Sequence, residues 1–161
     1  MKAFAELFAR LDETNRTNEK VAALEEYFHK AADEDAAWAL FFLIGNRLRA
    51  PVKTRQLRAW AAEESGLPAW LVEESYRFVG DLAETLALIL PEPDGSSAVS
   101  TIPLHEMVRD RIQRLGLLSG PAQRELLRET WASLSSRERF VFNKLITGSF
   151  RVGISRTLVS R

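Results

Sequence analysis

The sequence predicts an all-α protein with about ten helices. Apolar residues recur at helical spacing from the beginning of the chain, with Phe4, Leu7, Phe8 and Leu11 on one face. Glycine and proline separate one periodic segment from the next, and no segment alternates apolar and polar residues as a half-buried strand does. The chain has 161 residues, of which 46% are hydrophobic and 27% are charged, so we expect one globular domain.

Six helices are expected before residue 91, and start and stop signals define them. Thr17, Thr54 and Asp81 are candidate N-caps, and Pro68 suits the first turn of a helix. Residues 37–44 are apolar on every side, which predicts a helix in the centre of the core. The expected helices cover residues 4–11, 17–31, 33–44, 54–65, 68–79 and 81–90.

A segment rich in proline, glycine and serine, residues 91–97, is the clear linker of the chain. It divides the sequence into two halves, 1–90 and 98–161. In the second half, Ser135 and Glu138 form a capping box before an apolar helix that ends at Gly148. The expected helices here cover residues 104–112 (before Gly116), 121–131, 136–147 and 155–161. The tryptophans at positions 38, 60, 70 and 131 fall at helical spacing and are expected in the core.

The charges are balanced in number but uneven in position. The chain has 22 basic and 22 acidic residues, yet residues 36–62 and 139–161 contain no Asp or Glu and each carry five Lys or Arg. This pattern is typical of a positive face that binds a polyanion, and it also fits two solvated basic surfaces without a partner.

Several classes of protein are not expected from this composition. There is no cysteine, which excludes disulfides and thiolate metal sites. The sequence has no apolar run of about 18 residues and no signal-peptide pattern, so we expect a protein of the cytoplasm that does not span a membrane. His29 and His105 have no partner at metal-ligand spacing, and no metal site is expected.

Each acid-free segment contains an apolar helix that ends at a glycine and continues into a turn with an arginine. Gly45 precedes Arg47, and Gly148 precedes Arg151. Backbone N–H groups at such a turn, beside a cation, suit a phosphate. A single glycine is equally an ordinary helix C-cap. Phe150 is either a wedge that enters a groove or an anchor of the turn in the core. Two matching turns predict a surface that follows a sugar-phosphate backbone rather than one pocket.

The two halves repeat the same order of features. An apolar helix, a glycine turn and a basic helix follow one another around Gly45 and again around Gly148. The first half continues to a glycine-aspartate turn at Gly80, whose counterpart in the second half would fall beyond Arg161. We therefore expect the chain to be the front part of a longer protein and to end inside its second repeat.

The segment from Leu145 to Ser155, preceded by Arg137-Glu138-Arg139-Phe140, closely resembles the N-terminal DNA-binding domain of ATP-dependent DNA ligases. Residues 78–85, Phe-Val-Gly-Asp-Leu-Ala-Glu-Thr, are similar to the glycine-aspartate turn in the first half of that domain. Residues 1–17 also look like the family's first helix. The resemblance covers essentially the whole chain, and it is greatest to the bacterial ligases of this group.

The resemblance implies a helical domain of two pseudo-symmetric halves. Such a domain lies across the minor groove of nicked duplex DNA and holds the backbone on both sides of the nick, as a monomer and without sequence specificity. A following nucleotidyltransferase domain uses a lysine in a Lys-x-Asp-Gly motif to take AMP from ATP, with Mg²⁺. The lysines of this chain, at positions 2, 20, 30, 53 and 144, are not followed by x-Asp-Gly. We therefore expect the full-length protein to be a DNA ligase and this chain alone to be non-catalytic, with no catalytic residue and no cofactor of its own.

The expected DNA-binding residues combine the glycine turns with the cations and hydroxyls beside them. Arg47 and Arg151 are the foremost side chains, because a guanidinium can bind two phosphate oxygens at once. The full set is Gly45, Asn46, Arg47, Arg49, Lys53, Thr54, Arg55, Gly80, Thr147, Gly148, Ser149, Arg151, Gly153, Ser155 and Arg156.

Two other functions remain open from the sequence. A helical-repeat module could dock an acidic protein on its basic faces. A small enzyme of unknown chemistry is less consistent with the sequence, because no nucleophile–base pair, metal-ligand set or glycine-rich nucleotide loop is present. Binding to nicked DNA of arbitrary sequence that weakens with salt would distinguish the DNA-binding module from the protein-docking module.

Overall fold

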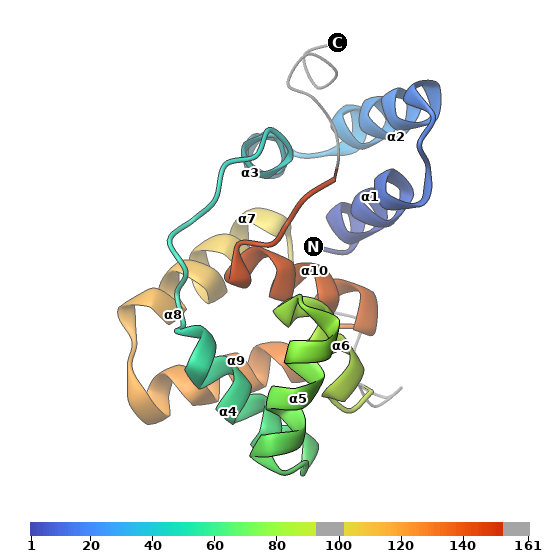
Figure 1. Ribbon diagram of the computed structural model, residues 1–161. Coiled ribbons are helices and arrows are strands. Elements are labelled where there is room, and N and C mark those ends of the chain that lie inside the picture. The colour runs from blue at the N-terminus through green and yellow to red at the C-terminus, as the bar shows by residue number, and fades with distance from the viewer. Residues whose placement is uncertain (93–101, 153–161) are drawn as a thin grey trace.

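Residues 1–92 and 102–152 are described by the computed structural model, and every regular element within them is helical (Figure 1). The prediction of an all-α protein is confirmed. The expected helix 155–161 and residues 93–97 of the expected linker lie outside the described residues. The elements are α1 (Lys2–Glu13), α2 (Thr17–Lys30), α3 (Asp33–Leu43), α4 (Thr54–Ser65), α5 (Ala69–Val79), α6 (Leu82–Ile89), α7 (Leu104–Met107), η1 (Val108–Gln113), α8 (Arg114–Leu117), α9 (Gly120–Ser133) and α10 (Ser136–Thr147).

Two of the expected N-caps are confirmed and two are wrong. Asp81 and Ser135 each accept a hydrogen bond from the backbone N–H three residues later, as an N-cap side chain does. Thr17 and Thr54 are instead the first helical residues of α2 and α4. The extended residues Arg16 and Lys53 occupy the cap positions, so the two threonine hydroxyls cap nothing.

The elements α7, η1 and α8 follow one another without an intervening loop. The residues at their junctions keep right-handed helical backbone angles, and η1 is a π-helical stretch within the same rod. Gly116 lies inside α8, although the sequence analysis placed it after the end of a helix. Burial of Met107, Ile112 and Leu115 on one side of the rod outweighs the low helical preference of glycine, so the helix continues through it.

One continuous core joins the two halves of the sequence. In Figure 1, α10 lies between α1 above it and α6 below it, and it packs against both. The helix α3 packs against α7 in the same way, so each half supplies one side of the shared interior. Fully buried side chains come from both halves and include Phe4, Leu57, Leu86, Met107 and Phe142.

Two expectations about the core are corrected by the structure. The helix α3 buries Ala39, Phe42 and Leu43 but leaves Leu40 exposed, so it is not enclosed on every side. Trp70 is 67% exposed, whereas Trp131 is buried as expected. Trp70 lies on α5, which packs against α4 and α6 and buries only Val72, so the other side of this helix faces solvent.

Candidate nucleic-acid interface

The two glycine turns lie side by side, although 103 residues separate Gly45 from Gly148. The Gly45 turn (residues 44–47) follows α3, and the Gly148 turn (residues 147–151) follows α10. Arg47 Nη1 donates a hydrogen bond of 3.5 Å to the carbonyl oxygen of Gly148. Residues of both turns line one hollow of about 380 Å³, and Arg47 and Arg151 are among them. The tertiary fold therefore forms one site from the two segments that the sequence singled out.

The backbone of both turns has the geometry of a helix C-cap. Gly45 has φ +98° and Gly148 has φ +71°, which glycine adopts without the steric cost that a side chain brings. The N–H of Gly45 donates to Phe42 O at 3.1 Å, and the N–H of Gly148 donates to Lys144 O. These N–H groups satisfy the helix ends and are not free phosphate donors, contrary to the expectation. Gly45 is exposed with nothing near its Cβ position, whereas the missing side chain of Gly148 leaves room for Arg47, whose Cδ would lie 3.4 Å from a Cβ there.

An aromatic cluster fixes the two turns relative to each other. Phe150 is buried, with its ring centroid 5.4 Å from that of Phe4 and 5.2 Å from that of Phe8. It also contacts Phe42, at 6.3 Å, which lies three residues before Gly45. Phe150 is therefore an anchor in the core and not a wedge. Because Phe42 and Phe150 belong to the same cluster, movement of one turn requires repacking at the other.

The expected cations of this region have no acidic partner. Arg47, Arg49, Lys53, Arg55 and Arg151 are all exposed, and none of them forms an ion pair with a carboxylate in the described part of the chain. Most other surface cations are paired: Arg10 lies 2.7 Å from Glu26, Arg58 2.7 Å from Glu73 and Arg124 2.5 Å from Glu63. The unneutralised positive charge is thus concentrated on the segment that carries the Gly45 turn and on the Gly148 turn.

Two cations of the second acid-free segment are internal, which corrects the view of that segment as a basic surface. Arg139 is buried and donates to Pro91 O at 2.8 Å, and burial holds the pKa of its guanidinium below the usual value. Lys144 is buried as well, with Nζ 3.4 Å from Asp81 and 3.7 Å from Glu84. Both side chains position α10 rather than face a ligand.

A third glycine turn, at Gly80, is joined to α10 by the ion pair between Asp81 and Lys144. Gly80 ends α5 and its N–H donates to Tyr76 O at 2.8 Å, so it is also a C-cap. The following residue, Asp81, caps α6 and binds Lys144, which lies one helical turn before Gly148. The structure thus brings the Gly80 turn to α10, through Asp81 and Lys144.

The remaining predicted residues divide into three groups. Thr147 Oγ1 donates to Asn143 O at 2.7 Å and lies 2.8 Å from Ser149 Oγ, so these hydroxyls are engaged within the turn. Asn46 and Thr54 are exposed on the same segment as the cations. Gly153, Ser155 and Arg156 lie outside the described residues.

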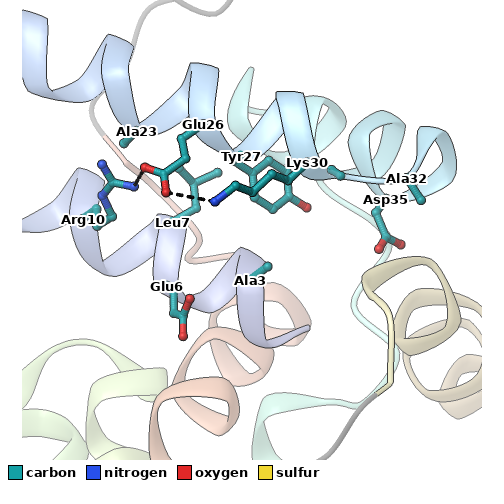
Figure 2. A pocket seen from close by; sticks show the side chains of 11 residues that line it. Ala3, Glu6, Leu7, Arg10, Ala23, Glu26, Tyr27, Lys30, Ala32 and Asp35 are labelled. Carbon is teal, nitrogen blue, oxygen red and sulfur yellow. Dashed lines mark hydrogen bonds and ion pairs between the residues drawn. The ribbon is translucent and has the colours of Figure 1, made fainter.

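A second hollow, of about 290 Å³, lies between α1 and α2 and has a different character (Figure 2). Its two cations, Arg10 and Lys30, both bind Glu26, and the hydrogen bond from Arg10 is the main reason that the pKa of Glu26 is lowered. Burial, with the nearby Asp35, raises the pKa of Tyr27. Both cations of this hollow are paired, and its lining also contains the acids Glu6 and Asp35. It therefore offers no unpaired positive charge to an anion and is not part of the candidate interface.

Neither a metal-binding cluster nor a membrane-spanning helix is found in the described part of the chain. Within residues 1–92 and 102–152, no cluster of three or more His, Cys, Asp or Glu side chains could hold a metal ion. The same residues include no helix that is both long and apolar enough to cross a membrane.

Comparison with known proteins identifies the family to which this chain belongs. The family model described as "DNA ligase N terminus" matches residues 1–161, and the chain belongs to this family. A protein named "DNA ligase" from Cenarchaeum symbiosum (strain A) is 27% identical over 162 residues, which cover 93% of this chain. The match spans 27% of the length of that relative. The family resemblance that the sequence indicated is therefore confirmed.

Proposed function

We propose that this domain binds nicked duplex DNA through its sugar-phosphate backbone, on the surface formed by the Gly45 and Gly148 turns. The observation that carries the proposal is the set of exposed cations around these turns that have no acidic partner. Phosphates would neutralise them, and backbone contacts of this kind position a protein without reading sequence. Membership of the DNA ligase N terminus family supports DNA as the polyanion.

The arrangement of the two turns allows the DNA backbone to approach the protein surface closely and does not require a deep pocket. Arg47 and Arg151 both line the hollow between the turns, and Gly45 and Gly148 add no side chain to its lining. A phosphate there would be bound by guanidinium groups, since the glycine N–H groups are engaged in the helix ends. Arg47 already donates to Gly148 O, which holds its side chain across the hollow.

The activity of the whole protein would belong to segments that this chain does not contain. We propose that the full-length protein is an ATP- and Mg²⁺-dependent DNA ligase of the cytoplasm and works as a monomer. The residues present do not fit AMP transfer: the chain has no Lys-x-Asp-Gly motif, and Lys30 and Lys144 are held in ion pairs. The contribution of this domain would be to hold the nick in place.

Fluorescence anisotropy with nicked duplexes of several sequences tests the proposal. Arg47→Ala and Arg151→Ala should each weaken binding equally on every sequence and reduce the slope of log K against log salt by about 0.9. Arg124→Ala is the matched control, because that arginine is exposed on α9 but paired with Glu63. Unchanged affinity and slope in both test variants would exclude the proposed surface.

Docking of an acidic protein on the basic surface remains the second candidate. The same unpaired cations support it. It predicts weak binding to DNA of every kind and tight binding to a polyglutamate chain, so the same measurements with both polyanions distinguish the two functions.

A further inference from the structure

A second groove, of about 740 Å³, adjoins the segment that carries the Gly45 turn. One wall is formed by residues 48–56, with Arg49 and Lys53, and the other by the end of η1 and the α8–α9 turn, with Gln113, Leu117 and Ser119. None of the DNA-binding residues expected from the sequence belongs to the second wall. Only the fold places residues 113–119 opposite the basic segment.

The two walls are tied to each other by a buried polar side chain. Gln123, on α9, is buried, and its Nε2 donates to Pro51 O at 2.8 Å and to Leu115 O at 3.0 Å. Pro51 belongs to the first wall, and Leu115 lies in α8 on the second. Val52 is also buried, which holds the extended segment against the core. The groove therefore exists before any ligand binds.

The charge of this groove favours an anion. Its lining contains Arg49 and Lys53, neither of which has an acidic partner among the described residues, and it contains no Asp or Glu. A groove of similar size between η1 and α9, about 810 Å³, is lined by four acids, Glu106, Asp110, Glu125 and Glu129. The contrast shows that the absence of acids is a property of this groove and not of the whole face of the molecule.

An exposed leucine gives the groove an apolar edge. Leu117 is 86% exposed and lines the groove. The faces of deoxyribose rings are largely apolar, whereas the phosphates between them are charged. A wall with one leucine opposite two cations therefore matches a sugar-phosphate strand better than it matches a free phosphate.

The groove and the hollow between the turns are lined by neighbouring residues of one segment, since Arg47 lines the hollow and Leu48 lines the groove. Six residues separate Arg47 from Lys53, and a fully extended chain of that length spans at most about 20 Å. That distance corresponds to about six base pairs along a duplex, which rises 3.4 Å per base pair. One duplex held at the Gly148 turn can therefore also lie in the groove.

We propose that this groove holds a second stretch of the sugar-phosphate backbone of the same duplex, with Arg49 and Lys53 on the phosphates and Leu117 against the sugars. The proposal rests on the proposed function and deepens it, since it extends the DNA-binding surface to residues of the α8–α9 turn.

Three variants test the proposal on a nicked duplex with long flanks. The double substitution Arg49→Gln with Lys53→Gln should lower the salt slope by about 1.8, which is the effect of two phosphate contacts. Leu117→Ala should weaken binding by about fivefold without changing the slope, because an apolar contact releases no counterion. The control is Leu88→Ala on α6, a leucine that is 72% exposed and outside the groove. All these side chains are exposed, so the unfolding temperature should not change.

Shortening one flank of the duplex at a time separates the groove from the turns. Removal of the flank that lies in the groove should abolish the effects of the Arg49/Lys53 and Leu117 variants and preserve that of Arg47→Ala. If the groove variants bind long duplexes like the original protein while Arg47→Ala weakens binding, the groove proposal is wrong and the proposed function stands. If Arg47→Ala and Arg151→Ala are silent as well, the proposed function itself fails. If the Arg49/Lys53 and Leu117 variants lost binding to polyglutamate but kept their binding to DNA, the groove proposal would also be wrong.

Discussion

Arg47 lies across the end of α10, with its Nη1 3.5 Å from the carbonyl oxygen of Gly148. This contact joins the two segments that carry the glycine turns, one from each half of the sequence. It gives the fold a surface in which the two foremost cations, Arg47 and Arg151, line the same hollow.

Gly148→Ala should destabilise the domain and disturb Arg47. A side chain in the left-handed conformation costs about 1–2 kcal/mol, and a Cβ at Gly148 would lie 3.4 Å from Arg47 Cδ. Gly66→Ala is the matched control: Gly66 has the same φ of +71°, and nothing lies within 4 Å of its Cβ position. Both variants should lose similar free energy of unfolding in urea, but only Gly148→Ala should also weaken DNA binding. Equal DNA affinity in the two variants would exclude a role for the Arg47 contact.

Phe150→Ala should be strongly destabilising. Truncation of a buried phenylalanine typically costs about 3–5 kcal/mol, and this ring contacts Phe4, Phe8 and Phe42. Phe150→Leu keeps most of the volume and should cost much less. DNA affinity of the leucine variant is measured at a temperature where the variant is fully folded. If the aromatic cluster orders the Gly148 turn, this affinity should fall. A leucine variant with normal stability and normal affinity would show that the aromatic contacts are dispensable.

Lys144 should contribute to stability and not to DNA binding. Its side chain is buried beside Asp81 and lies over the ring of Phe140, so Lys144→Met should destabilise by about 1 kcal/mol or more. Asp81→Asn removes the charge but keeps an oxygen that can cap α6. A double-mutant cycle between the two substitutions should give a coupling energy of about 0.5–2 kcal/mol. The salt slope of DNA binding should be unchanged, and a lower slope would assign Lys144 to the interface instead.

Acid titration should detect the ion pair between Arg10 and Glu26, two residues that line the hollow in Figure 2. The pKa of Glu26 is held below its ordinary value of 4.5, chiefly by the hydrogen bond from Arg10 and then by its charge. Because this pKa is lower in the folded state, the pair stabilises the fold at a pH above the pKa of the unfolded state. The stabilisation is lost as the pH falls through the pKa of the folded state. NMR titration of the Glu26 carboxyl should show its pKa rising toward 4.5 in Arg10→Ala. A pKa that does not move would show that the pair is not formed in solution.

The local structure was largely predictable because it depends on nearby residues. The positive-φ glycines at the ends of α3, α5 and α10 and the N-caps Asp81 and Ser135 were identified from short patterns, since helix ends are decided within one helical turn. Two failures were local, since Arg16 and Lys53 occupy the cap positions expected for Thr17 and Thr54. Two others had causes outside the local pattern. Gly116 stays helical because its neighbours are buried, and Trp70 is exposed because α5 packs through its other side.

The sequence by itself determined the helices, the glycine turns, the acid-free segments and the family of this domain. Only the tertiary structure decided that Arg47 meets Gly148, that Lys144 and Arg139 are internal, and that Leu117 faces the basic segment across a groove. The physical reason is the range of the interactions. Helix caps and periodicity involve residues a few positions apart, whereas the pairing of α10 with α1 and α6 and the burial of Phe150 depend on packing between distant parts of the chain.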